Sequence, residues 1–223
     1  MSGRPEAVAF DVIETLASLE PLRERLVTSG QPPELLDAWY TRTLRDGMAL
    51  AVTGDYAGFA DVAASALLGL THGTMSDDQL AHVMAGFSEL TAYPDALPAL
   101  QRLSEAGVPV ACLTNGGAEV VSAFVERAGL GPYVDRIITV AEVFRWKPAG
   151  VVYLYAAEVM RVAPGRMALV AAHDWDCHGA KRAGLTTGWV SRKSGRFGTP
   201  FAPPDVSGED LAQVAAGLLD LQP

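Results

Sequence analysis

Five short, mainly apolar runs recur along the chain, and they constrain its fold more than any other feature. The first lies near the N-terminus, and the other four follow Pro94, where helix-like segments separate one run from the next. Apolar runs this short are typical of buried parallel strands, and strands that alternate with helices imply βαβ units. We therefore predict an α/β fold with a Rossmann-like, doubly wound parallel sheet. The expected strands are residues 7–10, 108–113, 136–140, 167–171 and 186–190.

The segment between the first strand and Pro94 has a different character, because it is rich in Ala and Leu and lacks β-branched runs. An apolar stripe with helical spacing runs through residues 33–50, and residues 61–70 and 76–89 are also typical of helices. We predict that this segment is an inserted helical cap domain. The expected division is a helical cap over residues 15–91 and an α/β catalytic core formed by residues 1–14 and 92–223.

Glycines that follow helical patterns indicate where the core helices end. Residues 191–207 carry Gly, Pro and Ser, and we predict a long surface loop there. The expected core helices are residues 95–105, 118–128, 148–160, 176–183 and 207–221.

The charge and the cysteines argue against several classes of protein. With 223 residues and a net charge of −9, the chain is poorly suited to bind nucleic acid or an anionic membrane. Its two cysteines, Cys112 and Cys177, are far apart and match neither a disulfide framework nor a metal motif. No segment approaches the roughly 20 apolar residues of a membrane helix, and the N-terminus does not resemble a signal peptide. We expect a cytoplasmic protein whose partner is a small-molecule substrate.

Polar side chains follow most of the expected strands just past their carboxyl ends. In a doubly wound sheet these ends share one edge, where ligands bind, so the side chains can converge. Any one of them alone is more often a turn or solvent-facing residue, whereas the ordered set is far more specific. The set supplies a candidate carboxylate nucleophile, hydrogen-bonding groups, one cation and further carboxylates. Its members are Asp11, Thr15, Thr114, Asn115, Lys147, His173, Asp174 and Asp176.

These residues fall into four motifs with a recognisable order. In chain order they are Asp11-x-x-x-Thr15, Thr114-Asn115-Gly116, Lys147-Pro148 and Trp175-Asp176-x-x-Gly179-Ala180. Together they resemble the haloacid dehalogenase (HAD) superfamily, and most closely the type II haloacid dehalogenases, which are similar to the L-2-haloacid dehalogenases. The resemblance covers nearly the whole chain and implies a metal-independent hydrolase that needs no cofactor. Such relatives are commonly dimers, so a homodimer is one expectation.

The resemblance also implies a role for each matching residue. Asp11 attacks the halogen-bearing carbon of a short 2-haloacid, expels halide and becomes an ester. Asp176 then activates the water that hydrolyses the ester, and Lys147 pairs with the charge of Asp11. The other catalytic residues that it implies are Thr15, Thr114 and Asn115. The implied substrate-binding residues are Val12, Tyr40, Arg42, Tyr153, His173 and Trp175.

The sequence departs from the family that it resembles at several positions. Tyr40 stands where those relatives place an arginine that receives halide, although Arg42 is close by. Glu14 stands at a glycine position, and a second negative charge beside Asp11 opposes an anionic substrate unless it faces away or is paired. His173 stands where the family has an asparagine. Because of the residues at Glu14 and Tyr40, one alternative stays open: the chain is a catalytically weak homologue that binds a small anion without turning it over.

A magnesium-dependent phosphatase is the second alternative, because phosphate-ester hydrolysis is the dominant activity of the superfamily. Such phosphatases use a second Asp two positions after the nucleophile, where this chain has Ile13. They also use a metal-binding Asp at the position of Ala172. Magnesium favours oxygen ligands, carboxylates among them, so the loss of both residues favours metal-free chemistry. Asp174 could still restore a metal site, so this alternative stays open.

Overall fold

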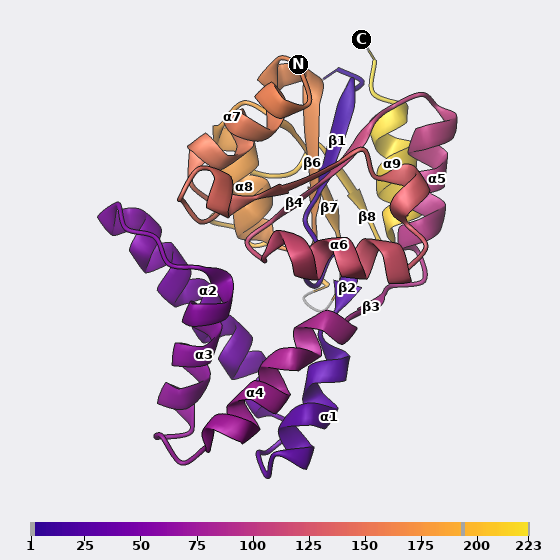
Figure 1. Cartoon of the computed structure of the whole chain (residues 1–223). Helices are drawn as coiled ribbons and strands as arrows, with labels where there is room; N and C mark the ends of the chain where they lie inside the picture. The colour runs from indigo at the N-terminus through magenta and orange to yellow at the C-terminus, as the bar shows by residue number, and fades with distance from the viewer. Residues whose placement is uncertain (1–2, 193–194, 223) are drawn as a thin grey trace.

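The computed structural model describes residues 3–192 and 195–222, and a six-stranded sheet forms its centre (Figure 1). Every pairing in that sheet is parallel, in the order β5-β4-β1-β6-β7-β8. The doubly wound parallel sheet is therefore confirmed, and all the predicted strands are present. The strands are β1 (Ala7–Phe10), β4 (Val110–Thr114), β5 (Arg136–Thr139), β6 (Met167–Ala171), β7 (Thr186–Val190) and β8 (Val206–Gly208).

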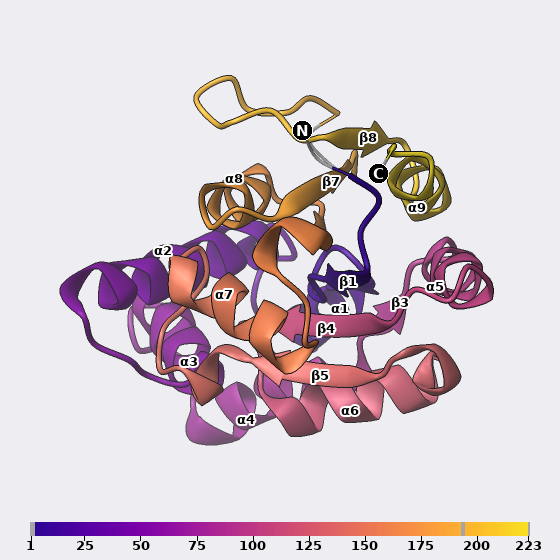
Figure 2. The same ribbon diagram turned by 90° about the horizontal axis from the view of Figure 1, so that it is seen from above.

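Helices cover both faces of the sheet, because alternate side chains of each strand point to opposite sides. Phe10 of β1 packs in one core cluster with α5 (Ala96–Glu105), α6 (Ala118–Arg127) and α9 (Leu211–Leu219). Ala9 packs in the other cluster with α7 (Gly150–Val159) and α8 (Asp174–Arg182). Figure 2 shows α5 and α9 on one side of the sheet and α7 and α8 on the other. A sheet covered on both faces needs apolar residues at almost every position, which explains the continuous apolar runs.

The end of the predicted loop 191–207 forms part of a strand, which corrects that prediction. β8 pairs with β7 at the edge of the sheet, and its three residues are too few to give an apolar run. The last helix begins at Leu211 rather than at residue 207, because Asp210 caps it. The Oδ1 atom of Asp210 accepts a hydrogen bond from the backbone N–H of Gln213 at 2.7 Å.

A helical bundle lies beyond the carboxyl ends of the strands (Figure 1). Its elements are α1 (Glu20–Thr28), α2 (Leu35–Thr53), α3 (Phe59–Leu70), α4 (Asp77–Ala85) and the 3-10 turn η1 (Gly86–Glu89). The chain leaves and re-enters the core through an antiparallel pair, β2 (Ala17–Ser18) and β3 (Thr91–Ala92). The helices predicted here are present, α1 is an addition to them, and the division into cap and core domains remains a prediction. Within the described chain, no helix combines the length and the apolar character needed to cross a membrane.

Helix α2 approaches the core closely at Gly47, where there is no room for a side chain. A Cβ atom at Gly47 would lie 2.3 Å from the ring of Trp146. Trp146 is fully buried, and its Nε1 donates a hydrogen bond to the carbonyl oxygen of Ala57 at 2.9 Å. Because Lys147 follows Trp146 directly, this packing also fixes the backbone that presents Lys147.

The variant Gly47→Ala is expected to be less stable than the wild type by about 1–3 kcal/mol, because the added methyl group has to displace the Trp146 ring. Urea unfolding followed by circular dichroism measures this difference. Gly150→Ala is the matched control, since a Cβ atom there meets no other atom within 4 Å. The control should be at least as stable as the wild type, and equal stability of the two variants would contradict the close packing at Trp146.

Candidate active site

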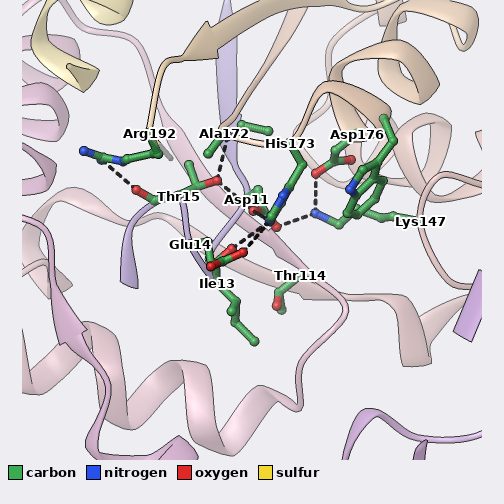
Figure 3. Close-up of polar contacts among 12 residues, drawn as sticks. Asp11, Ile13, Glu14, Thr15, Thr114, Lys147, Ala172, His173, Asp176 and Arg192 are labelled. Carbon is green, nitrogen blue, oxygen red and sulfur yellow. Dashed lines mark hydrogen bonds and ion pairs between the residues drawn. The ribbon is translucent and has the colours of Figure 1, made fainter. Parts of the chain in front are cut away.

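The polar side chains at the strand ends come from neighbouring strands. Asp11 follows β1, which lies between β4 and β6 in the sheet. Thr114 ends β4, and Asp176 lies in the first turn of α8, which follows β6. The carboxyl ends of parallel strands share one edge, so these residues gather there. Lys147 reaches the same edge from the turn before α7, and Figure 3 shows its ammonium group between two carboxylates.

A buried ammonium group joins Asp11 to Asp176. The Nζ atom of Lys147 lies 2.7 Å from Asp11 Oδ1, 2.7 Å from Asp176 Oδ2 and 3.0 Å from the carbonyl oxygen of Leu113. Lys147 and Asp176 are fully buried, and Asp11 is 5% exposed. Buried charges are tolerated where they are paired and hydrogen-bonded, and here one positive charge serves two negative ones. The burial of both carboxylates, Asp11 and Asp176, therefore depends on the positive charge of Lys147.

Burial and charge act in opposite directions on the pKa values of these groups. Burial alone lowers the pKa of Lys147, but the charges of Asp11 and Asp176 outweigh it and leave that pKa above its ordinary value. Burial raises the pKa of Asp176, and the ammonium group of Lys147 limits the rise. Lys147 therefore stays a cation through the neutral range, and Asp176 accepts a proton more readily than an exposed aspartate does.

Thr15 holds the second oxygen of Asp11. Its Oγ1 donates a hydrogen bond to Asp11 Oδ2 at 2.7 Å and accepts one from the backbone N–H of Ala172 at 2.9 Å. An amide N–H can only donate, so the single hydroxyl proton of Thr15 is directed at Asp11. Lys147 and Thr15 together thus fix the carboxylate of Asp11 in one orientation.

Tyr153 and Asn115 hold the partners of Asp11 in place. The hydroxyl group of Tyr153 donates to Asp176 Oδ1 at 2.6 Å, and Asn115 Oδ1 accepts from the backbone N–H of Lys147 at 3.0 Å. Burial, followed by the charge of Asp176, raises the pKa of Tyr153 well above its ordinary value, so its hydroxyl group remains a donor. Both predicted residues therefore lie in the network around Asp11, one step removed from it.

His173 faces two carboxylates. Its Nε2 lies 3.2 Å from the carbonyl oxygen of Ile13, 3.8 Å from Asp11 Oδ2 and 3.9 Å from Glu14 Oε2 (Figure 3). A carbonyl oxygen only accepts hydrogen bonds, so Nε2 carries a proton. The carboxylate of Glu14 therefore lies beside the ring of His173, on the same side as Asp11. The φ of Glu14 is 66° and lies in the left-handed region that glycine adopts without steric cost.

Two aromatic residues predicted to bind substrate surround His173. Trp175 stacks on its ring with the centroids 5.1 Å apart, and the centroid of the Tyr40 ring is 6.1 Å away. Burial raises the pKa of Tyr40 well above its ordinary value, and the charges of Asp11 and Glu14 add to the rise. Tyr40 therefore lies close enough to the two carboxylates for their charges to affect its pKa. Its hydroxyl group stays protonated.

The structure does not place Arg42 with the other predicted substrate-binding residues, which corrects that prediction. Arg42 forms an ion pair with Asp46 at 3.7 Å and packs over Gly69 of α3. Consecutive residues of an α-helix are rotated by about 100°, so residues two positions apart point in nearly opposite directions. Since Tyr40 faces the site, Arg42 has to face away from it.

Arg192 is a residue near the site that the sequence analysis missed. Its guanidinium group donates to both carboxylate oxygens of Asp95 at 2.9 Å and to the carbonyl oxygen of Thr15 at 2.8 Å. It also lies 4.0 Å from the centroid of the Tyr93 ring. Arg192 thereby fastens the turn that carries Thr15 to the core. Its position just after the strand 186–190 was a usable signal, since other functional candidates also follow strand ends.

Two pockets adjoin the network. A polar pocket of about 170 Å³ lies between Glu14, His173 and Arg192. An apolar cavity of about 400 Å³ lies between α6 and the helical bundle, and Val12 and Ile13 form part of its wall. The predicted substrate-binding residue Val12, which follows Asp11 in the chain, is thus a wall residue of this cavity.

No three His, Cys, Asp or Glu side chains within residues 3–192 and 195–222 are grouped so that they could hold a metal ion. The side chains of Ile13 and Ala172 carry no ligand atom. Asp174 accepts a hydrogen bond from the backbone N–H of Trp175 at 2.8 Å. The cation that bridges Asp11 and its partner carboxylate is the ammonium group of Lys147.

Comparison with known proteins gives a consistent set of relatives. A family model described as a haloacid dehalogenase-like hydrolase matches residues 5–184. The chain is 30% identical to an (S)-2-haloacid dehalogenase of Xanthobacter autotrophicus, over 85% of this chain and 76% of that protein. It is 28% identical to an (S)-2-haloacid dehalogenase of Pseudomonas putida, over 96% of this chain and 98% of that protein. Among solved structures, a dehalogenase with an intermediate complex matches with a TM-score of 0.87 at 26% identity, covering 96% of this chain and 97% of that one.

Proposed function

This chain belongs to the haloacid dehalogenase-like hydrolases, and on that premise we propose that it removes halide from 2-haloacids by hydrolysis, through an ester of Asp11. One observation carries the proposal: the ammonium group of Lys147 lies 2.7 Å from both the Asp11 and the Asp176 carboxylates. A carboxylate aimed by fixed hydrogen bonds can act as a nucleophile, and the relatives compared above are (S)-2-haloacid dehalogenases.

In the first step, a carboxylate oxygen of Asp11 attacks C2 of the haloacid from the side opposite the halogen. A carbon–oxygen bond forms as the carbon–halogen bond breaks, and the halide leaves with the bonding electron pair. The product is an ester of Asp11, so one difficult displacement is divided into two easier steps. The hydrogen bonds from Thr15 and Lys147 hold the nucleophile in place, which reduces the entropy lost on reaching the transition state.

In the second step, water attacks the side-chain carbonyl carbon of the ester and loses a proton. We assign the base to Asp176, because burial raises its pKa and thus its proton affinity. The bond between that carbon and the ester oxygen breaks, which releases a 2-hydroxy acid and restores the Asp11 carboxylate. Lys147 stabilises the negative charge that develops on the Asp11 oxygen, and Asn115 holds the backbone of Lys147. Thr114 accepts a hydrogen bond from the backbone N–H of Gly116 at 2.9 Å and so shapes the loop after β4.

The departing halide needs hydrogen-bond donors, and the arginine that relatives use at the position of Tyr40 is absent. We assign this role to the hydroxyl group of Tyr40, whose ring centroid lies 6.1 Å from that of His173. That hydroxyl group is a donor because its raised pKa keeps it protonated.

Chloride release from 2-chloropropionate is expected to proceed at an unchanged rate in excess chelator, because Lys147 supplies the positive charge at Asp11. An ion-selective electrode measures the release, with heat-denatured protein as the control. If an aryl phosphate is hydrolysed only after magnesium is added, and no haloacid is turned over, the phosphatase alternative holds instead. If neither reaction occurs in folded protein, the chain is the weak anion-binding homologue.

We also propose that the protein works in a reducing compartment such as the cytoplasm, as a homodimer. The support for the compartment is that Cys112 and Cys177 are both free and buried. The state of the cysteines is tested by unfolding the protein without reductant and alkylating it, and both thiols should react. The homodimer is tested by sedimentation of the native protein, which gives its mass in solution.

A further inference from the structure

The apolar cavity between α6 and the helical bundle has the size of a ligand-binding pocket. Its volume is about 400 Å³, and its wall consists mainly of hydrophobic side chains from α3, α4, η1 and α6. A cavity of this size and character is typical of a small-molecule binding site.

Residues next to the nucleophile form part of the cavity wall, although Asp11 itself does not line the cavity. Val12 and Ile13, the two residues that follow Asp11, line it on one side, and Asn115, which follows Thr114, lines it on another. Asn115 also accepts the hydrogen bond from the backbone of Lys147. A ligand that reacts at Asp11 with its polar end can therefore extend its apolar end into the cavity.

The size of the cavity argues against the smallest 2-haloacids as preferred substrates. The methyl group of 2-chloropropionate is about as large as a water molecule, whose share of liquid volume is roughly 30 Å³. Such a group would fill only a small part of the 400 Å³ and would contact few of the side chains that line it.

The wall is rich in aromatic rings. Tyr56, Phe59, Phe87 and Phe124 all contribute, and the Phe59 and Phe87 rings already meet edge to face, with centroids 5.1 Å apart at 88°. Aromatic rings prefer edge-to-face and offset contacts, which gives an aromatic guest an advantage over an alkyl chain of similar area.

We propose that the preferred substrate is a 2-haloacid with an aryl ring on C2, bound with that ring among Tyr56, Phe59 and Phe87. This inference rests on the proposed dehalogenation. Asp11 displaces the halide at the carbon that carries the ring, the halide leaves with the bonding electrons, and water releases a 2-aryl-2-hydroxy acid and one proton. The carboxylate stays at the polar end of the cavity, beside Asn115.

Calorimetric binding of two unreactive acids, phenylacetate and propionate, tests the cavity without any chemical step. Phenylacetate is expected to bind about tenfold more tightly or better, from the apolar area of the ring. Val120 is a half-buried wall residue on α6, and Val120→Trp should cancel that difference. If this variant folds poorly, Met84→Trp fills the cavity from α4 instead. The matched control is Val151→Trp, because Val151 is 46% exposed on α7 and does not line the cavity.

Chloride release from 2-chloro-2-phenylacetate and 2-chloropropionate is measured on the same proteins. The ratio of the two kcat/KM values should fall about tenfold or more in Val120→Trp, and the intrinsic reactivity of the benzylic carbon cancels in that comparison. Equal binding of the two unreactive acids, or an unchanged ratio in both filled variants, overturns the inference while the proposed function stands. If phenylacetate binds selectively but neither chloroacid releases chloride, the proposed function fails and the cavity remains a site for aryl acids.

Discussion

Replacing Asp11 with Asn is expected to lower the rate of halide release by about 10⁴-fold or more, because the amide cannot act as the nucleophile. The side chain keeps its shape, so the fold should persist. Its stability should fall by about 1–3 kcal/mol, because the amide nitrogen then faces either the hydroxyl of Thr15 or the ammonium of Lys147. Chloride release and circular dichroism on the same preparation separate the two effects.

Asp174→Asn is the matched control for this substitution. Asp174 lies next to the site in sequence, and its contact with the backbone of Trp175 survives the change because an amide oxygen also accepts. Its activity should therefore stay close to that of the wild type. Retention of substantial activity by Asp11→Asn would disprove the nucleophilic role, and loss of activity in the control would revive a metal site at Asp174.

The intermediate itself should accumulate when its hydrolysis is blocked. In Asp176→Asn, halide is expected to be released once per molecule, while the protein gains the mass of the acid less hydrogen halide. Mass spectrometry of the peptide that contains Asp11 checks both the mass and its location. Continued turnover without an adduct would mean that a group other than Asp176 activates the water.

The strand-end residues could be predicted because topology alone brings them together. Once a doubly wound parallel sheet is expected, every side chain just past a carboxyl end belongs to one edge, whatever the details of packing. This is how Asp11, Thr114 and Asp176 were found, and the structure places all three at that edge. The strands themselves were recognisable because a sheet covered on both faces needs continuous apolar runs.

Features that depend on rotation or on tertiary contacts were not accessible in the same way. Arg42 was mistaken for a site residue because proximity in sequence to Tyr40 does not mean proximity on a helix. The edge strand β8 is too short to give a pattern. The contact of Glu14 with His173 joins two segments that only the folded chain brings together. The same holds for the two hydrogen bonds from the guanidinium group of Arg192 to the carboxylate of Asp95.

Replacing Lys147 with Met is expected to lower the free energy of unfolding by about 3–5 kcal/mol, because two buried carboxylates lose their shared positive charge. Halide release should fall by about 10²–10³-fold as well, since the developing charge on Asp11 loses its stabilising partner. Lys181→Met is the matched control. Lys181 also pairs with an aspartate, Asp205 at 2.9 Å, but its side chain is 30% exposed, so the cost should be about 0–1 kcal/mol. Urea unfolding and chloride release measure both variants.

A double variant and a pH series distinguish lost charge from lost packing. Adding Asp176→Asn to Lys147→Met removes one of the two uncompensated charges, so part of the stability should return while activity does not. The pKa of Lys147 in the folded protein lies above its ordinary value of about 10.4. Its stabilisation is therefore complete below that pH and is lost as the pH rises through the folded value. The stability of the wild type should thus approach that of Lys147→Met only in that alkaline range. If the difference in stability between the two proteins is the same at every pH, Lys147 contributes packing rather than charge.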